Sequence, residues 1–194
     1  MARIYMIRHG KAAAGWAADP DPGLDAEGQA QAEAVAEHLG PALSEKAGPL
    51  PVLTSPLKRC RETSIPLARM WSLVPVVEPL VSEIPSPTDD LEARGAWLRR
   101  IMPGTWADIA KDQTSGTVDF TGWRDALVQR LQRIEQDTVI FSHFIAINAA
   151  VGAAKGNDSV VVFRPDNCSV TQLETSSDGL HVVSLGREAD TVVR

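Results

Sequence analysis

Residues able to bind and attack a phosphoryl group follow two short apolar runs in this sequence. The run IYMI leads directly into Arg8, His9 and Gly10, and the run TVIF leads into Ser142 and His143. A guanidinium offers a planar fork of donors that matches phosphate oxygens, and a neutral imidazole can act as a nucleophile. These residue types therefore indicate a site that binds a phosphoryl group.

A third apolar run, Pro51–Thr54, leads into Ser55 and a helical pattern that carries Arg59 in its first turn. In open α/β sheets, ligands bind outside the carboxyl ends of the strands. If the three runs are neighbouring parallel strands, two arginines and two histidines surround one pocket. We expect the helices after Ser55 and His143 to add their N-terminal amides, and Gly10 to let the backbone approach the ligand.

His9 is the better candidate nucleophile of the two histidines. Nearby positive charge disfavours protonation of an imidazole, so we expect the pKa of His9 to fall and its lone pair to stay free. We expect His143 to donate to the phosphoryl oxygens, together with the guanidinium groups of Arg8 and Arg59.

The composition limits the classes of function. The chain has 194 residues, of which 44% are hydrophobic, and a formal net charge of −6. This acidity argues against nucleic acid as a partner, and no apolar stretch approaches the ~20 residues that span a membrane. No targeting segment is visible, so we expect a cytoplasmic protein, and the sequence leaves its oligomeric state open.

Neither the cysteines nor the histidines have the spacing of a metal site. We interpret Cys60 and Cys168 as reduced thiols rather than a disulfide. His38 and His181 are interpreted as structural or surface residues, and no two histidines share a zinc-binding spacing. The sequence therefore predicts neither a metal nor a cofactor.

Strands that alternate with helices predict an α/β fold with a largely parallel sheet. The stretch 24–40 predicts a helix with Asp25 as its N-cap, and we expect this helix to stop at Gly40 and Pro41. The next helix must accommodate Pro66, so we expect a kink or a break there.

A final hairpin with Asp178 and Gly179 in its turn makes part of the sheet antiparallel, so we expect a mixed sheet. The remaining expected elements are strands at 74–79 and 138–141, and helices at 91–102, 106–111, 123–134 and 145–154.

Five short motifs give the sequence a family resemblance. RHG ends the first strand, SPLKRCRET follows the second, and SH ends a late strand, while LDAEGQAQA and DNCSV add two further matches. Together they resemble the histidine phosphatase superfamily, whose fold is phosphoglycerate-mutase-like. The resemblance implies a three-layer αβα sandwich with a mostly parallel, partly mixed central sheet, in a single domain over 1–194.

The resemblance also implies a mechanism. His9 attacks phosphorus and becomes phosphorylated, while Arg8, Arg59 and His143 stabilise the spreading charge. A carboxylic acid protonates the leaving oxygen and then helps a water molecule to release phosphate. In this family that acid often lies in an L-x-E segment after the third strand.

The sequence departs from the family pattern at three places. The segment LVSEI places Glu83 one residue later than the L-x-E pattern; we take Glu83 as the acid, with Asp89 in reserve. Lys11 replaces a polar residue that often follows RHG, and we expect that it could approach the anion. Phe144 stands where a glycine usually follows the second histidine, and should narrow the pocket or reshape its wall.

These residues favour a metal-independent phosphomonoesterase that acts through a phosphohistidine at His9. Two alternatives stay open: a phosphoglycerate-mutase-type phosphotransferase, and a phosphate-binding module without turnover. The expected substrate is a small-molecule phosphate ester or a phosphorylated protein side chain.

The segment 85–125 is long enough to cover the pocket, and we expect it to form a helical lid. It is rich in tryptophan, proline and arginine. The arginines at 94, 99 and 100 either extend the positive rim of the site or form a solvated helix face, and we favour the second interpretation. We interpret Trp97, Trp106 and Trp123 as core or lid residues.

Overall fold

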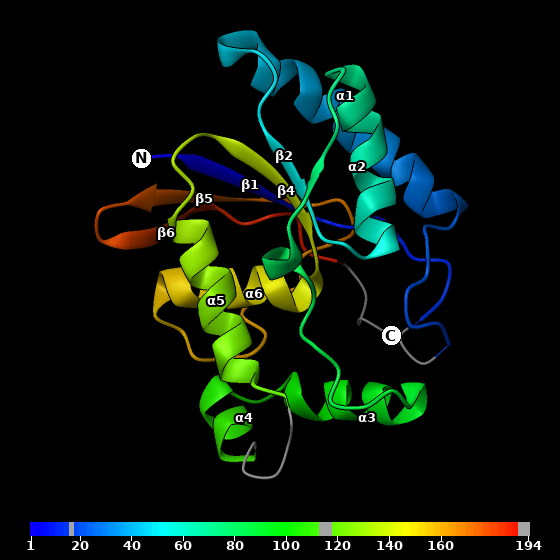
Figure 1. Cartoon of the computed structure of the whole chain (residues 1–194), viewed down its shortest axis with the longest axis vertical. Helices are drawn as coiled ribbons and strands as arrows, with labels where there is room; N and C mark the ends of the chain where they lie inside the picture. Colours follow the sequence, from blue (N-terminus) through cyan, green and yellow to red (C-terminus); the bar gives the residue numbers. More distant parts are fainter. Residues whose placement is uncertain (16–17, 113–117, 190–194) are drawn as a thin grey trace.

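The computed structural model describes residues 1–15, 18–112 and 118–189 (Figure 1). The strands are β1 (Arg3–Arg8), β2 (Val52–Thr54), β3 (Val76–Val77), β4 (Thr138–Ser142), β5 (Val170–Ser176) and β6 (Gly179–Ser184). The helices are α1 (Ala26–Ala47), α2 (Lys58–Met70), the 3-10 helix η1 (Pro79–Val81), α3 (Leu91–Ile101), α4 (Trp106–Asp112), α5 (Phe120–Gln132) and α6 (Phe144–Lys155).

The strands form one six-stranded sheet in the order β3-β2-β4-β1-β5-β6. The first four strands in this order pair in parallel, and the hairpin of β5 and β6 adds two antiparallel pairings. Figure 1 shows α1 and α2 on one side of the sheet and α5 and α6 on the other. The predicted three-layer sandwich with a mostly parallel, partly mixed sheet is confirmed.

The middle residues of the central strands β1 and β4 are largely apolar because helices cover both faces of the sheet. In β4, Ile140 packs with the core on the α5 and α6 side, while Val139 and Phe141 pack with the core on the α1 and α2 side. Successive side chains of a strand point to opposite faces, so a strand covered on both faces reads as a continuous apolar run.

Helix α1 is longer than the sequence predicts. Its start is as expected, since the side chain of Asp25 accepts a hydrogen bond from the amide of Gly28. The predicted stop at Gly40 and Pro41 is wrong, because α1 passes through both residues and ends at Gly48, whose φ is +76°. The carbonyl of Gly40 accepts a hydrogen bond from Nε1 of Trp71, so packing against α2 supports this part of the helix.

Helix α2 continues through Pro66 rather than breaking there. Pro66 is buried, and tertiary packing offsets the backbone hydrogen bond that proline cannot make. The helix begins at Lys58 rather than directly after Ser55, and Oγ of Ser55 accepts a hydrogen bond from the amide of Leu57 in the turn before it.

Helices α3 and α4 lie below the lower end of α5 in the view of Figure 1. Their aromatic side chains join them to the core: Trp97 stacks on Phe120 with ring centroids 5.0 Å apart, and Trp106 lies 6.0 Å from Trp123. Trp106 is buried. These tryptophans are therefore packing residues.

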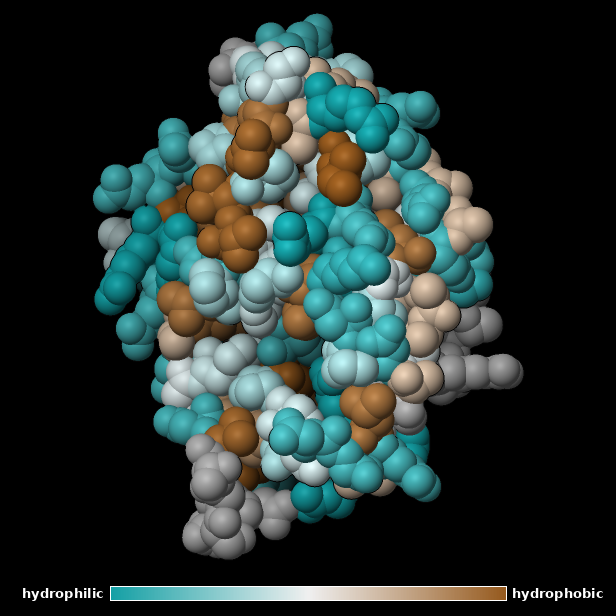
Figure 2. Space-filling model, turned by 45° about the vertical axis from the view of Figure 1, so that its right-hand side comes forward, coloured by the Kyte–Doolittle hydropathy of each residue, from teal (hydrophilic) through white to brown (hydrophobic). Residues whose placement is uncertain are grey.

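The surface in Figure 2 carries apolar side chains in small groups that polar residues interrupt. The exposed large apolar side chains include Ile65, Met70, Val74, Val76 and Val77, which belong to α2, β3 and the loop between them. Within the described part of the chain, no helix combines the length and the apolar character needed to cross a membrane.

Candidate active site

The carboxyl ends of β1, β2 and β4 lie side by side. Arg8 at the end of β1 pairs with Ser142 at the end of β4, and Thr54 at the end of β2 pairs with Phe141. The residues that follow these ends therefore emerge at one edge of the sheet, as the strand-end pattern predicts.

Arg59 lies between the two histidines. Its Nε donates a hydrogen bond to Nε2 of His9 at 3.2 Å, and its Nη2 lies 3.1 Å from Nδ1 of His143. The two imidazole rings meet edge to face with their centroids 5.3 Å apart. All three side chains are buried, so α2 brings its arginine into the centre of the site.

The hydrogen bonds of His9 define its tautomer. Nδ1 lies 2.7 Å from the carbonyl oxygen of Gly10, which can only accept, so Nδ1 carries the proton. Nε2 accepts from Arg59 and therefore has its lone pair free of a proton. The carbonyl of His9 in turn accepts from Nδ2 of Asn167 at 2.8 Å, which holds the backbone of this residue in place.

His143 adopts the opposite tautomer. Its Nδ1 faces the guanidinium of Arg59, which can only donate, so Nδ1 is the acceptor. Nε2 then carries the proton and lies 2.8 Å from Oγ of Ser55. The thiol of Cys60 lies 3.3 Å from the same nitrogen, and burial raises the pKa of this thiol well above its ordinary value, so the thiol stays protonated.

The surroundings keep both imidazoles neutral. Burial lowers the pKa of His9 well below its ordinary value of 6.5, and the positive charges of Arg59 and Arg8 lower it further. Burial likewise lowers the pKa of His143, with further contributions from Arg59, His9, Arg8 and Arg94. The lowered pKa expected for His9 agrees with this finding.

Two contacts hold the guanidinium of Arg8, and its buried Nε is without a hydrogen-bond partner among the described residues. Its Nη1 donates to the carbonyl of Pro165 at 2.9 Å, and its Cζ lies 5.2 Å from the centroid of the Phe144 ring. Among the described residues, Nε of Arg8 has no hydrogen-bond partner although it is buried. A buried donor without a partner is costly, and an anion in the site would satisfy it.

Phe144 packs beneath Arg8 and belongs to the core. The cation–π contact with the guanidinium favours a fixed orientation of Arg8. The aromatic ring that replaces the usual glycine therefore forms a wall that supports Arg8.

Glu83 is buried at the N-terminus of α6. Its carboxyl oxygens accept hydrogen bonds from the amides of Ile84, Ile145 and Ala146 at 3.0 to 3.3 Å. Burial raises the pKa of Glu83 above 4.5, although these amides and Arg59 oppose the shift. Asp89, the reserve candidate, is exposed on the loop before α3.

The sequence predicts that the amides at the N-termini of α2 and α6 face the ligand, but carboxylates of the chain accept hydrogen bonds from several of them. Glu83 occupies the amides of Ile145 and Ala146 at the start of α6. At the start of α2, the amide of Lys58 donates to Asp21, whose Oδ1 also lies 3.8 Å from Nη1 of Arg59. Carboxylates of the chain itself therefore bind where an anionic ligand was expected.

The structure gives a different reason for glycine at position 10. A Cβ atom on Gly10 would lie 2.5 Å from the carbonyl oxygen of Gly28 in α1, which is too close. The amide of Gly10 donates to Oγ1 of Thr63 in α2. Helix packing explains the missing side chain, and an approach of the Gly10 backbone to a ligand stays a prediction.

Lys11 does not face the site. Its ammonium pairs with Glu27 at 2.5 Å and lies 3.7 Å from Asp25, and its side chain is about half exposed. The expectation that Lys11 could approach the anion is wrong, because carboxylates at the start of α1 hold it on the surface.

Sequence reasoning missed the residues that position the site. The sequence places Ser55 only at the start of a helix, and Thr63 and Asn167 lie in motifs that carry the resemblance but have no role assigned from the sequence. For Arg94 the sequence favours a solvated helix face over the positive rim of the site, but its electrostatic interactions with Arg59 and Glu83 place it beside the site. Its spacing from the buried Leu98, four residues on, was the signal available.

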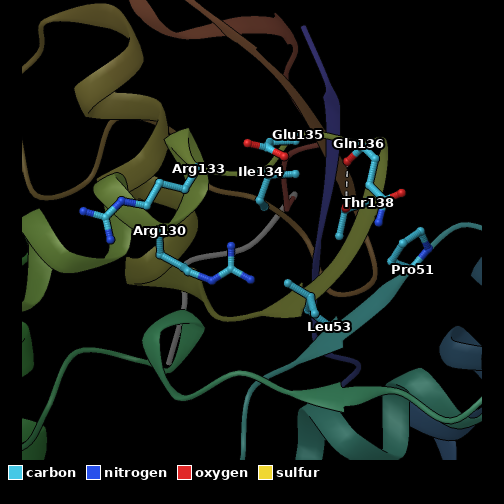
Figure 3. Close-up of a pocket in the computed structure, with 8 residues that line it drawn as sticks. All are labelled: Pro51, Leu53, Arg130, Arg133, Ile134, Glu135, Gln136 and Thr138. Atoms are coloured by element: carbon cyan, nitrogen blue, oxygen red, sulfur yellow. Dashed lines mark hydrogen bonds between the residues drawn. The ribbon is translucent and has the colours of Figure 1, made fainter.

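A separate pocket of about 580 Å³ lies at the opposite edge of the sheet (Figure 3). Its walls include Pro51, Leu53 and Thr138, which belong to the amino ends of β2 and β4, and Arg130, which pairs with Glu78 at 2.6 Å. This pocket contains none of the candidate site residues. Over the described ranges, no group of three or more histidine, cysteine or acidic side chains is arranged to hold a metal ion.

Comparison with known proteins gives one family match and several similar folds. The model of the histidine phosphatase superfamily (branch 1) matches residues 4–188. No curated protein matches the chain in sequence.

Among solved structures, a mycobacterial protein called hydrolase 1 is 24% identical over 97% of this chain and 99% of its own, with a TM-score of 0.71. A mycobacterial glucosyl-3-phosphoglycerate phosphatase is 24% identical over 97% of this chain and all (100%) of its own, with a TM-score of 0.69. A phosphoserine phosphatase variant from Entamoeba histolytica, in complex with phosphoserine, is 18% identical over 95% and 96% of the two chains, with a TM-score of 0.70.

Proposed function

The chain belongs to the histidine phosphatase superfamily, branch 1, and from this premise we propose that it is a phosphomonoesterase acting through a phosphohistidine at His9. One observation carries the proposal: a neutral His9 presents an unprotonated Nε2 beside the buried guanidinium groups of Arg8 and Arg59. The two named phosphatases among the similar structures support the same reaction class.

In the first step, Nε2 of His9 attacks phosphorus in line with the ester oxygen. The new N–P bond forms as the P–O bond to the alcohol breaks, and the carboxyl proton of Glu83 passes to the leaving oxygen. Arg8 and Arg59 bind the transferred oxygens, and the charge that the phosphoryl group brings favours a protonated, donating His143.

In the second step, water cleaves the phosphohistidine. The ionised Glu83 takes a proton from the water, the new O–P bond forms, and the N–P bond breaks to return Nε2 of His9 with its lone pair. The positive charges of the arginines stabilise the spreading charge in both steps, so the proposed reaction needs no metal ion and no cofactor.

The described parts of the segment 85–125, residues 85–112 and 118–125, cover the site in this proposal, and residues 113–117 lie outside the described residues. The segment begins two residues after Glu83 and contains α3, whose Arg94 interacts electrostatically with Arg59. The helices of this segment act as a lid anchored by the tryptophan contacts, within one domain that spans the chain.

Hydrolysis of p-nitrophenyl phosphate in the presence of EDTA tests the proposal. We expect turnover that survives chelation and is abolished in His9→Ala. The matched control is His38→Ala, which removes an exposed histidine of α1. A phosphorylated substrate should leave an acid-labile, base-stable label on the wild-type protein and none on His9→Ala.

Three outcomes would contradict the proposal. Phosphate binding without turnover would identify a binding module, and label on a serine would show a different nucleophile. Transfer of the label to a phosphoglycerate acceptor in preference to water would identify a phosphotransferase of the mutase type.

A further inference from the structure

The three arginines of α3 differ in their surroundings. Arg94 is partly buried, whereas Arg99 and Arg100 are exposed. Arg94 precedes the buried Leu98 by four residues and the buried Ile101 by seven, so it belongs to the inward face of the helix. Arg94 therefore lies on the face of α3 that packs inward.

Arg94 interacts with groups on one side of the site. Its charge is coupled to the carboxyl group of Glu83 and to Arg59, and it helps to lower the pKa of His143. Burial is the largest cause that lowers the pKa of Arg94 itself. The guanidinium of Arg94 on α3 therefore lies near Arg59, Glu83 and His143.

Arg94 has an unused donor. Within the described residues, its Nε is buried without a hydrogen-bond partner, and no carboxylate forms an ion pair with its guanidinium. Glu83, the acidic group that interacts electrostatically with Arg94, already accepts hydrogen bonds from three backbone amides. A buried cation in this condition is stabilised by an anion that comes from outside the chain.

The position of Arg94 indicates which part of the substrate that anion belongs to. The transferred phosphoryl group already has Arg8, Arg59 and His143 in the proposed function. A general acid must lie on the side of the leaving oxygen, so Glu83 marks the alcohol side of the ester. Because Arg94 is coupled to Glu83, it lies near the alcohol portion of the substrate.

We propose that Arg94 binds a second anionic group, a carboxylate or a phosphate, on the alcohol portion of the substrate. The preferred substrates are then phosphate monoesters of acidic alcohols. This inference rests on the proposed phosphatase reaction and adds the substrate class to it. The guanidinium fork of Arg94 matches either anion with two parallel hydrogen bonds.

The test compares kcat/KM for two pairs of substrates that differ in the second anion. Phosphoglycolate is compared with ethyl phosphate, and 1,3-propanediol bisphosphate with propyl phosphate. We expect wild-type protein to prefer an anionic member, and Arg94→Met to lower that preference by about 10- to 100-fold, mainly through KM. Arg94→Lys should retain part of the preference, because it keeps the charge and loses the fork.

The matched control is Arg99→Met, which removes the same charge from the exposed face of the same helix. It should leave both selectivity ratios at the wild-type value. Ratios within one variant cancel any general loss of folded protein, so partial misfolding of Arg94→Met does not affect the comparison.

Each outcome has a distinct meaning. If the carboxylate pair alone responds to Arg94→Met, the second anion is a carboxylate; if the bisphosphate pair alone responds, it is a phosphate. If wild-type protein hydrolyses the esters without a second anion as well as those that carry one, or if the ratios are unchanged in Arg94→Met, this inference is wrong and the proposed function stands. If wild-type protein hydrolyses none of the four esters, both are wrong.

Discussion

Nε of Arg59 donates a hydrogen bond to Nε2 of His9 across 3.2 Å. The lone pair that is proposed to attack phosphorus is therefore engaged by a cation. A bound phosphoryl group offers Arg59 charged oxygen acceptors, which form stronger hydrogen bonds than a neutral imidazole. Binding of the substrate should thus draw the guanidinium away and free the nucleophile at the moment when phosphorus is within reach.

Replacement of Arg59 tests this coupling. We expect Arg59→Met to lower kcat for p-nitrophenyl phosphate by about 100- to 1000-fold, since the variant loses donors aimed at the charge that develops in the transition state. Steady-state kinetics measure the loss, and circular dichroism checks that the variant is folded. Arg61→Met removes an exposed cation from the same helix and should keep wild-type kcat. A loss for Arg59→Met no larger than for Arg61→Met would contradict the role.

Glu83 as the acid predicts a dependence on the leaving group. Glu83→Gln should slow the hydrolysis of ethyl phosphate by about 100- to 10,000-fold, because the ethoxide must be protonated as it leaves. p-Nitrophenolate is stable without a proton, so formation of the phosphohistidine from p-nitrophenyl phosphate should be affected far less. Burst kinetics separate this step from the second one. An equal effect on the first step of both esters would argue against Glu83 and favour another acid.

The pKa shifts of the site predict the pH dependence of kcat/KM. The reactive form needs a neutral His9, whose pKa is lowered from 6.5, and a protonated Glu83, whose pKa is raised from 4.5. Activity toward an alkyl phosphate should fall as the pH rises through the pKa of Glu83, and fall again below that of His9. We therefore expect an optimum between the pKa of His9 and the pKa of Glu83, and Glu83→Gln should lose the decline on the alkaline side.

The buried histidines also predict how stability depends on pH. The pKa of His9 is lower in the folded than in the unfolded protein, so its contribution to stability is complete above about pH 6.5 and is lost as the pH falls toward the folded pKa. The loss is at most about 1.4 kcal/mol per pH unit for one histidine. Urea unfolding between pH 7 and pH 5 should show a smaller slope in His9→Gln than in the wild type.

The comparison of slopes is needed because Glu83 acts in the opposite direction. Its pKa is raised on folding, so its contribution is complete at low pH and is lost as the pH rises through the folded pKa. Wild type and His9→Gln both contain Glu83, so the difference between their slopes isolates the histidine. Equal slopes would show that the ring of His9 does not become harder to protonate on folding.

The contact between Gly10 and Gly28 predicts a cost for any side chain at position 10. Gly10→Ala should lower the free energy of unfolding by about 1–3 kcal/mol, because its Cβ meets backbone that cannot rotate away. Gly15→Ala is the matched control, since a Cβ there has no atom within 4 Å. Urea unfolding measures both variants, and equal stability of the two would contradict the packing argument.

The strand-end pattern was sufficient to predict that one site contains Arg8, His9, Arg59 and His143. Parallel strands that end at one edge place the following residues close to one another, and this rule depends only on local sequence and on the order of strands. The start of α1 after Asp25 was predicted correctly for a similar reason, because a helix cap contacts an amide within three residues along the chain.

The errors concern residues whose surroundings come from distant parts of the chain. Lys11 pairs with Glu27, which lies 16 residues later in the chain. The helix continues through Gly40, whose carbonyl accepts a hydrogen bond from Trp71. Arg94 was assigned to solvent because arginine on a helix is usually exposed, and its inward position depends on how α3 docks. Tertiary contacts override local preference at each of these positions.

The candidate nucleophile belongs to the first strand, but late residues hold it in place. Arg8 donates to the carbonyl of Pro165, 157 positions later, and the carbonyl of His9 accepts from Asn167, 158 positions later. Synthesis proceeds from the N-terminus, and contacts between distant segments form slowly. A growing polypeptide thus carries the imidazole of His9 long before Asn167 is made, and the contact that holds the His9 backbone forms only after Asn167 has emerged from the ribosome.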